Sequence, residues 1–266
     1  MVYRFVFLGN ILGAVCCAKL IKKALDFLFF FDILLTMQQV IKLRQYEPEQ
    51  ILFCSDLHLN HDKEFLWGKR GFVSEQEHAA VVEAAWNEHV TDDSVVFHLG
   101  DSHFRDGKGE AFDAFSRWKG RIYHLWGNHN SGAKQCFRKA VAEYLGADQY
   151  VEVYPISYNN VTFLGTQQII SYRGQAVFLS HFAHRIWEDM NKGVWHLHGH
   201  SHGNDLKRLP DCVEQKALDV GVEVAFNYHS NYNPFFTWND ISKIINKKKY
   251  VQLDHHDGLT APSRQH

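Results

Sequence analysis

The sequence has few cysteines, no long apolar run and almost no net charge. Its five cysteines are an odd number and include no C-x-x-C pair, a pattern that favours reduced thiols in a cytoplasm over a disulfide framework. No apolar run reaches the ~18 to 20 residues that a membrane-spanning helix needs. The formal net charge of -2 argues against binding of bulk nucleic acid through charge alone, although a local basic rim is compatible with it.

The chain also lacks internal repeats and low-complexity linkers that would divide its 266 residues into several domains. With 45% hydrophobic and 22% charged residues, its composition is typical of a globular protein with one sizeable core. We expect one domain over residues 37–250, followed by a polar tail over residues 251–266. Histidine is the over-represented residue, with 18 copies.

Residues 1–36 form a mainly apolar extension in which lysines separate two apolar stretches. Three interpretations remain open: a secretory signal with a weak cleavage site, a membrane-surface anchor through residues 5–35, or an extension outside the functional product with translation starting at Met37. We favour the last, and membrane contact is not favoured, because the patterning of a soluble domain begins directly afterwards. A cytoplasmic location follows from this interpretation.

From residue 50 onward, short apolar runs alternate with helical patterns. The expected strands cover residues 51–54, 94–97 and 121–125, and the expected helices cover residues 74–89, 110–118 and 133–145. Ser74 and Glu77 have the spacing of a capping box at the start of the first helix. This alternation predicts an α/β fold with parallel strands and helices on both faces, in which the chemistry lies at the carboxyl ends of strands.

The second half is expected to contain antiparallel hairpins. The dipeptides Asn159-Asn160 and Arg173-Gly174 separate short strand-like runs and are typical of hairpin turns. The expected strands cover residues 150–154, 161–164, 168–172, 176–180 and 216–220, and a closing helix covers residues 238–246.

The stretch over residues 196–202, His-Leu-His-Gly-His-Ser-His, carries the strongest functional signal. Because alternate side chains of an extended segment point the same way, His200 and His202 can bind metal from one edge of a sheet, while Gly199 lets the backbone turn close to the ions. An isolated H-x-H is more often a pair of ordinary histidines, but further candidate ligands recur where other predicted strands end. These candidates are Asp56, His58, Asp101, Asn128, His129 and His181.

These blocks, taken in order, resemble the calcineurin-like metallophosphoesterase family, and in particular its small bacterial and phage members. The blocks are Asp56-x-His58, Gly100-Asp101, Gly127-Asn128-His129, His181 and Gly199-His200-x-His202. The resemblance covers residues 50–245. It implies a four-layer α/β-β/α sandwich of two mixed sheets flanked by helices, with a binuclear metal centre at the strand ends.

The resemblance also implies a role for each position. One ion would be held by Asp56, His58 and His202. The other would be held by Asn128, His181 and His200, and Asp101 would bridge the two ions. Oxygen ligands mixed with imidazoles suit two divalent ions of Mn, Fe or Zn. Two ions ~3.5 to 4 Å apart can stabilise the attacking and leaving oxygens of an in-line displacement, with a bridging water as the source of hydroxide.

Catalysis would then rest on Asp101 and His129, and Asn128 and His129 would contact the substrate. His129 would protonate the leaving alkoxide or neutralise phosphate oxygens. Asp219 and Gly221 are expected to shape the surroundings of the ions rather than to bind them.

Some positions depart from the family pattern. Asn130 stands where an acidic residue is common, so the group that orients His129 is expected to come from elsewhere. Three further imidazoles, His61, His103 and His184, fall near the expected site. Each is interpreted either as a polar residue at the rim or as a phosphate contact.

The loop over residues 61–72 combines three aromatic and three basic side chains with two glycines. It either caps the sheet or overhangs the metal centre. In the second case Lys69 or Arg70 would pair with a phosphate oxygen, and Trp67 or Phe65 would stack against a base. We assign Trp67 and Arg70 to substrate binding on this basis.

Two classes of function fit the sequence. The first is a metal-dependent phosphoester hydrolase acting on a small phosphodiester or nucleotide-type substrate through a two-metal-activated hydroxide. The second is a catalytically weak metal-binding scaffold of the same fold that holds a partner. The presence of every implied ligand and of His129 favours the enzyme, while the substrate and the choice between monoester and diester stay open.

Overall fold

The computed structural model describes residues 40–104, 114–115, 117–145, 154–204 and 215–249. The chain divides after Gln38, and the unit that begins at Gln39 contains all of these residues. The expected extension and polar tail lie outside the described residues, as do most of the strand expected over 150–154 and of the helix expected over 110–118. Among the described helices, none has both the length and the apolar character needed to cross a membrane.

The first sheet has six strands in the order β11-β2-β3-β4-β6-β5. They are β2 (Ile51–Cys54), β3 (Val95–His98), β4 (Arg121–His124), β5 (Ile156–Tyr158), β6 (Val161–Phe163) and β11 (Phe236–Thr237). Strands β2, β3, β4 and β6 are parallel, while β5 and β11 pair antiparallel at the two edges. The parallel pairing predicted for the first half of the chain is therefore confirmed.

The second sheet has five strands in the order β1-β7-β8-β9-β10. They are β1 (Ile41–Lys42), β7 (Gln167–Tyr172), β8 (Gln175–Ser180), β9 (Trp195–His198) and β10 (Ala217–Asp219). Strands β7 and β8 form the predicted hairpin, in which Arg173 and Gly174 both have positive φ, 48° and 88°, as a tight hairpin turn requires. The other pairs are parallel, so both sheets are mixed.

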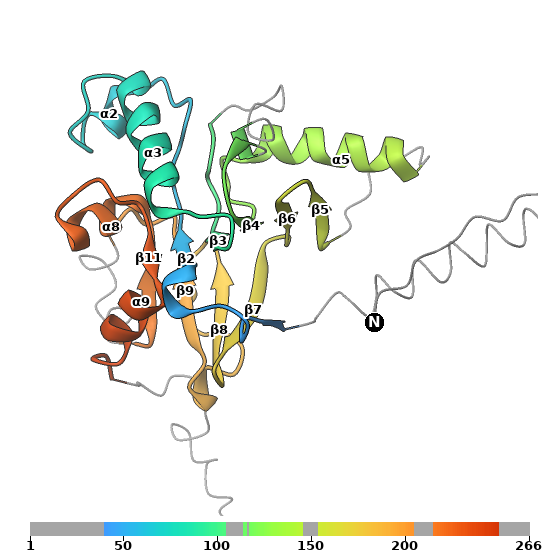
Figure 1. The fold of residues 1–266 in the computed structure, drawn as a ribbon, viewed down its shortest axis with the longest axis vertical. Helices are drawn as coiled ribbons and strands as arrows, with labels where there is room; N and C mark the ends of the chain where they lie inside the picture. Colours follow the sequence, from blue (N-terminus) through green and yellow to red (C-terminus); the bar gives the residue numbers. More distant parts are fainter. Residues whose placement is uncertain (1–39, 105–113, 116, 146–153, 205–214, 250–266) are drawn as a thin grey trace, which may run out of the picture. The chain divides into compact units, whose positions relative to one another are not determined.

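The helices flank these sheets (Figure 1). They are η1 (Pro48–Gln50), α2 (Glu64–Trp67), α3 (Glu75–His89), α5 (Ser131–Leu145), η2 (Met190–Lys192), α8 (Val222–His229) and α9 (Trp238–Ile245). Only half of the predicted capping box forms at α3: Ser74 Oγ accepts from the Glu77 N–H, but the Glu77 carboxylate accepts from Val73 instead. Helix α8, which the sequence pattern did not predict, follows β10 directly.

The core divides into layers according to the alternation of side chains along the strands. Phe53 and Phe97 face the other sheet, where they stack at 5.4 Å within an apolar cluster that draws residues from both sheets. Leu52 and Val96, one position away, face the opposite side and pack with Trp86 of α3, because successive residues of a strand point to opposite faces. On the outer face of the five-stranded sheet, Met190 of the short helix η2 packs in a small apolar cluster with Phe178 of β8 and Ala217 of β10.

Candidate metal centre

Each predicted ligand follows the carboxyl end of a strand, and hydrogen bonds between the loops bring these ends together. Asp56 donates its backbone N–H to Gly100 at 3.0 Å, and His58 donates to Asp101 at 2.9 Å, so the pairing of β2 with β3 continues into the loops. On the other sheet, Gly199 donates to the carbonyl of His181 at 3.0 Å. The backbone N–H of His200 then donates to Asp56 Oδ2 at 2.9 Å, so the two sheets present their candidate ligands side by side.

Five of the predicted ligands have a left-handed backbone conformation. Their φ values are 60° for Asp56, 49° for His58, 54° for Asp101, 67° for His200 and 51° for His202. Such conformations cost ~1 to 3 kcal/mol each in a residue other than glycine and cluster at functional sites. The expectation of an extended H-x-H was wrong, because β9 ends at His198 and left-handed turns, rather than strand alternation, direct His200 and His202.

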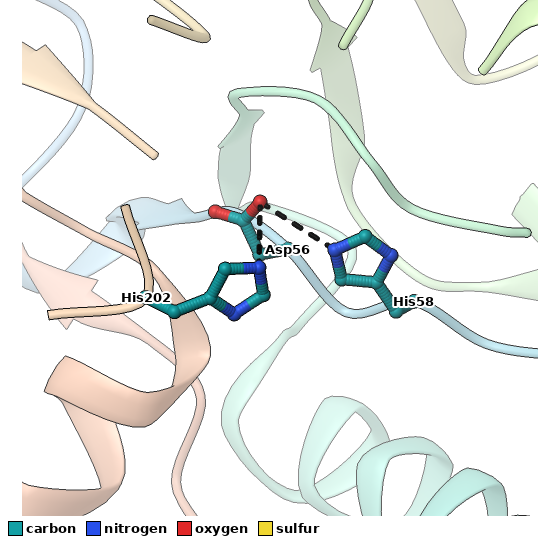
Figure 2. A group of neighbouring side chains, drawn as sticks. All are labelled: Asp56, His58 and His202. Atoms are coloured by element: carbon teal, nitrogen blue, oxygen red, sulfur yellow. Dashed lines mark ion pairs between the residues drawn. The ribbon is translucent and has the colours of Figure 1, made fainter. Parts of the chain in front are cut away.

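The first group of candidate ligands is Asp56, His58 and His202 (Figure 2). Asp56 Oδ1 lies 3.7 Å from His58 Nε2 and 4.0 Å from His202 Nε2. These spacings are too long for hydrogen bonds, but two donors that share one ion at ~2.1 Å each lie at most ~4.2 Å apart. Asp56 Oδ1 and His58 Nε2 are buried and have no hydrogen-bond partner among the described residues. Their arrangement fits a cation between them.

The second group contains Asp101, His181 and His200, and Asn128 lies against it. Asn128 Oδ1 is 3.0 Å from both His181 Nε2 and His200 Nδ1. His181 Nε2 is 3.2 Å from Asp101 Oδ2. Two oxygens and two imidazole nitrogens therefore lie close enough together to be candidate ligands of one ion.

Asp101 stands between the two groups. Its Oδ2 lies 3.2 Å from His181 Nε2 in the second group and 3.8 Å from His58 Nε2 in the first. Its other oxygen, Oδ1, accepts the backbone N–H of His129 at 2.8 Å. The Asp101 carboxylate can therefore serve both groups through one oxygen while the other fixes its rotation.

Burial shifts the pKa values of two residues of the first group. Burial raises the pKa of the Asp56 carboxyl to about 7 and lowers the pKa of His58 to about 2. Burial also acts to raise the pKa of Asp101, but the hydrogen bond and charge of His181 outweigh it and hold that pKa below its usual range. A bound cation stabilises an ionised carboxylate and a neutral imidazole together, which is the protonation state that ligands require.

Hydrogen bonds on the far side of two imidazoles orient them toward the centre. His181 Nδ1 lies 2.8 Å from the carbonyl oxygen of Leu99, and His202 Nδ1 lies 2.8 Å from Glu223 Oε1. Both partners are acceptors, so each favours a proton on Nδ1, the tautomer that leaves Nε2 available to the proposed ion. Such partners raise the basicity of a ligand and fix its tautomer.

Two glycines allow the loops to approach this closely. A Cβ at Gly199 would overlap the side chains of Ser55 and Asp56, and a Cβ at Gly127 would overlap the side chain of Asp101. Any other residue at these positions would displace a ligand.

Asn130, the departure from the family pattern, ties two ligand loops together. Its Oδ1 accepts the backbone N–H of Asp101 at 2.8 Å and that of Gly127 at 3.0 Å. The amide oxygen of Asn130 thus accepts hydrogen bonds as the acidic residue of the family pattern could. Asn130 is connected to His129 through Asp101, which accepts the backbone N–H of His129. Its position directly after the Gly-Asn-His block is the signal that marks it in the sequence.

Asp219, at the end of β10, contacts the backbone of the surrounding loops. Its Oδ2 accepts from Gly203 at 2.9 Å, and its Oδ1 accepts from Gly221 at 2.7 Å. Gly203 directly follows His202, so Asp219 supports the turn that carries this ligand.

The structure corrects the assignment of Arg70 to substrate binding. The side chain of Arg70 has no exposed surface, and its guanidinium is 2.7 Å from Glu223. It therefore packs behind the centre. Trp67 is half-buried, whereas Phe65, in the same helix α2, is 61% exposed. Phe65, not Trp67, is the aromatic side chain of this loop that a ligand reaches most readily.

The three further imidazoles are not exposed rim residues. His61 is buried and packs against Phe104, with ring centroids 4.1 Å apart and the rings tilted by 38°. His103 is also buried, and burial lowers its pKa to about 3. His184 is half-buried and donates its backbone N–H to His196. None of these contacts supports a role in binding phosphate.

The comparisons with known proteins assign no activity. No protein-family profile matches the chain. It is 26% identical over 205 residues to uncharacterized protein MJ1445 of Methanocaldococcus jannaschii, covering 76% of this chain and 95% of that protein. It is 28% identical over 189 residues to the gene 66 protein of Mycobacterium phage L5, covering 64% of this chain and 85% of that protein. Among solved structures, the protein of unknown function AQ665 from Aquifex aeolicus aligns over 73% of this chain and 97% of its own, with 18% identity and a TM-score of 0.48.

Proposed function

We propose that the protein is a metal-dependent phosphoester hydrolase that binds two divalent ions. The observation that carries this proposal is the position of Asp101, whose Oδ2 lies within 4 Å of an imidazole nitrogen from each ligand group. A carboxylate shared between two histidine-rich groups is the arrangement that a binuclear centre requires. The order of the sequence blocks, which resembles the calcineurin-like metallophosphoesterases, supports the same proposal.

The donor atoms favour Mn, Fe or Zn as the bound ions. Each group mixes imidazole nitrogens with carboxylate or amide oxygens and contains no thiolate. Such a set lies between the all-oxygen sites of Mg²⁺ and Ca²⁺ and the thiolate sites of softer ions. When bound, two such ions would polarise a phosphoryl oxygen and generate hydroxide from water near neutral pH.

His129 is proposed to donate a proton to the leaving oxygen. Its backbone is held by Asp101, its ring lies 5.3 Å from that of His58, and the residue is exposed. Although it stands beside the ligands, His129 belongs to neither group of converging donors. Its imidazole is therefore free to act as an acid or to stabilise charge on a phosphoryl oxygen.

Access to the centre supports an enzyme over a metal-binding scaffold. Asn128, His129 and His200 are exposed, while Asp56, His58 and Asp101 beneath them are buried. A site with purely structural ions is normally closed by protein ligands, whereas a catalytic site keeps a side open to substrate. A small phosphodiester or nucleotide is the proposed substrate, because exposed aromatic rings lie near the open side. The tilted rings of Phe182 and His200 have centroids 4.6 Å apart. The ring of Phe65 lies 5.4 Å from that of His61, which lies 5.9 Å from that of His58.

The test combines metal content with turnover. The full chain, stripped with a chelator and then titrated with Mn²⁺, is expected to bind two ions and to hydrolyse bis-nitrophenyl phosphate, with activity rising as the sites fill. A panel of nucleotides, cyclic nucleotides and dinucleotides then identifies the substrate class. Two bound ions with no hydrolysis of any phosphoester would favour the scaffold, and failure to bind two ions would overturn the proposal.

A further inference from the structure

A buried guanidinium lies directly behind the first group of ligands. Arg70 donates from Nε and Nη2 to Glu223 Oε1 at 2.8 and 2.7 Å. Its Nη1 donates to the carbonyl of Leu57 at 2.8 Å, and its Nη2 donates to the carbonyl of Asp56 at 2.7 Å. The fifth contact is from Nη1 to His78 Nε2 at 2.9 Å. Because a guanidinium has five N–H groups and accepts nothing, all of its donors are engaged within the protein.

Glu223 connects this guanidinium to a ligand. Its Oε1 accepts from Arg70 and also lies 2.8 Å from Nδ1 of His202. The other oxygen, Oε2, is buried and has no hydrogen-bond partner among the described residues. One carboxylate oxygen of Glu223 therefore joins Arg70, which lies between α2 and α3, to His202, which lies in the loop after β9. Arg70 and Glu223 are 153 positions apart in the sequence, so this is a tertiary contact.

Arg70 also contacts the backbone of the turn that carries the other two candidate ligands of the first group, Asp56 and His58. The carbonyls of Asp56 and Leu57 belong to the turn that carries Asp56 and His58, and both ligands have positive φ. A conformation of this kind persists only where its surroundings hold it. Arg70 thus holds the turn on one side while Glu223 holds His202 on the other.

We propose that Arg70 and Glu223 are positioning residues that preorganise the Asp56, His58 and His202 ion site. Glu223 fixes the His202 tautomer, so that Nε2 faces the ion, and Arg70 fixes both Glu223 and the Asp56 turn. This inference rests on the metal centre of the proposed function. The His181 imidazole of the second site is oriented by a different partner, the Leu99 carbonyl, so loss of Glu223 should weaken one ion and spare the other.

The test is a Mn²⁺ titration of the metal-free full chain and its variants, with bound ions counted per chain. Removal of a partner behind a metal ligand weakens binding ~10 to 100-fold. Glu223→Ala is therefore expected to weaken one of the two ions by about that factor and leave the other within about twofold. Glu223→Gln retains the Oε1 acceptor and is expected to fall between Glu223→Ala and the natural protein.

A matched control is available in the ion pair between Arg173 and Glu47. This pair spans 3.3 Å, but both side chains are more than half exposed. Glu47→Ala removes the same kind of partner far from the centre, so both ions should bind as in the natural protein. Equal weakening of both ions in Glu223→Ala, or unchanged binding of both, would overturn the inference.

The His202 tautomer provides a measurement that does not depend on a folded variant. In the metal-free natural protein, the imidazole ¹⁵N shifts of His202 should show a proton on Nδ1. A neutral His202 with its proton on Nε2 instead of Nδ1 would overturn the inference even if Glu223→Ala failed to fold. A natural protein that binds fewer than two ions would instead overturn the proposed function, so the two failures are distinguishable.

Discussion

The backbone N–H of His129 donates a 2.8 Å hydrogen bond to Oδ1 of Asp101. The residue proposed as the acid is thereby joined to the carboxylate proposed as the bridge. Because the bond uses Oδ1, the Oδ2 atom of Asp101 remains directed toward His58 and His181. The Asp101 carboxylate therefore both positions the backbone of His129 and directs negative charge toward the two ligand groups. Substitutions at Asp101 and at His129 should have different consequences.

Asp101→Asn is expected to lose more metal and more activity than His58→Ala. The amide retains the shape of the side chain but removes the negative charge shared by both ions, whereas His58 serves one ion only. Metal content and turnover measured on both variants decide the matter. An Asp101→Asn protein with two ions and full activity would show that the bridging assignment is wrong.

His129→Ala is expected to retain both ions and to slow hydrolysis ~10² to 10⁴-fold, the usual contribution of general acid catalysis. The loss should be smaller for a nitrophenyl ester than for an alkyl ester, because a good leaving group needs little protonation. The comparison requires kcat on both esters, with metal content as the control. Equal losses on the two esters would argue against proton donation by His129.

Phe65→Ala is expected to raise KM for nucleotide substrates while leaving a small nitrophenyl ester nearly unchanged. A base stacked on an aromatic side chain contributes ~1 to 3 kcal/mol, and Phe65 is the exposed aromatic of α2. Val73→Ala is the matched control, since Val73 is 80% exposed in the loop before α3. If both variants bind nucleotides as the natural protein does, the loop has no role in base recognition.

Acid should destabilise the fold through its buried neutral histidines. Burial lowers the pKa of His98 to about 3 and lowers the pKa values of His124 and His196 well below the ordinary value. The unfolded chain, with histidine pKa values of ~6.5, therefore binds more protons below that pH. The stability contributed by each neutral histidine is complete above pH ~6.5 and falls by ~1.4 kcal/mol per pH unit as the pH drops toward the folded pKa.

The pH dependence of unfolding in His124→Gln isolates this effect. All other groups are shared with the natural protein, so the slope of unfolding free energy between pH ~6 and ~4 should be shallower by ~1.4 kcal/mol per pH unit. His89→Gln, at the end of α3, serves as the control. Equal slopes in His124→Gln and the natural protein would show that His124 is protonated in the fold.

The sequence by itself identified the residues of the candidate metal centre and much of the fold around it. Apolar runs such as residues 51–54 predicted strands, the residues directly after them predicted the ligands, and the alternation of strands with helices predicted parallel pairing. These features are local, because the face and the end of a strand are set by its own side chains. The ligand residues could therefore be named before their positions in space were known.

Only the tertiary structure decided how these residues are supported. The composition of its loop suggested that Arg70 contacts substrate, but the packing of α8 beside the loop places Glu223 within 2.7 Å of it and makes it a buried partner of the centre. Likewise, His200 and His202 converge through left-handed turns rather than strand alternation. Contacts between distant segments depend on how helices and sheets pack, and a charged side chain is buried only where that packing supplies its partners.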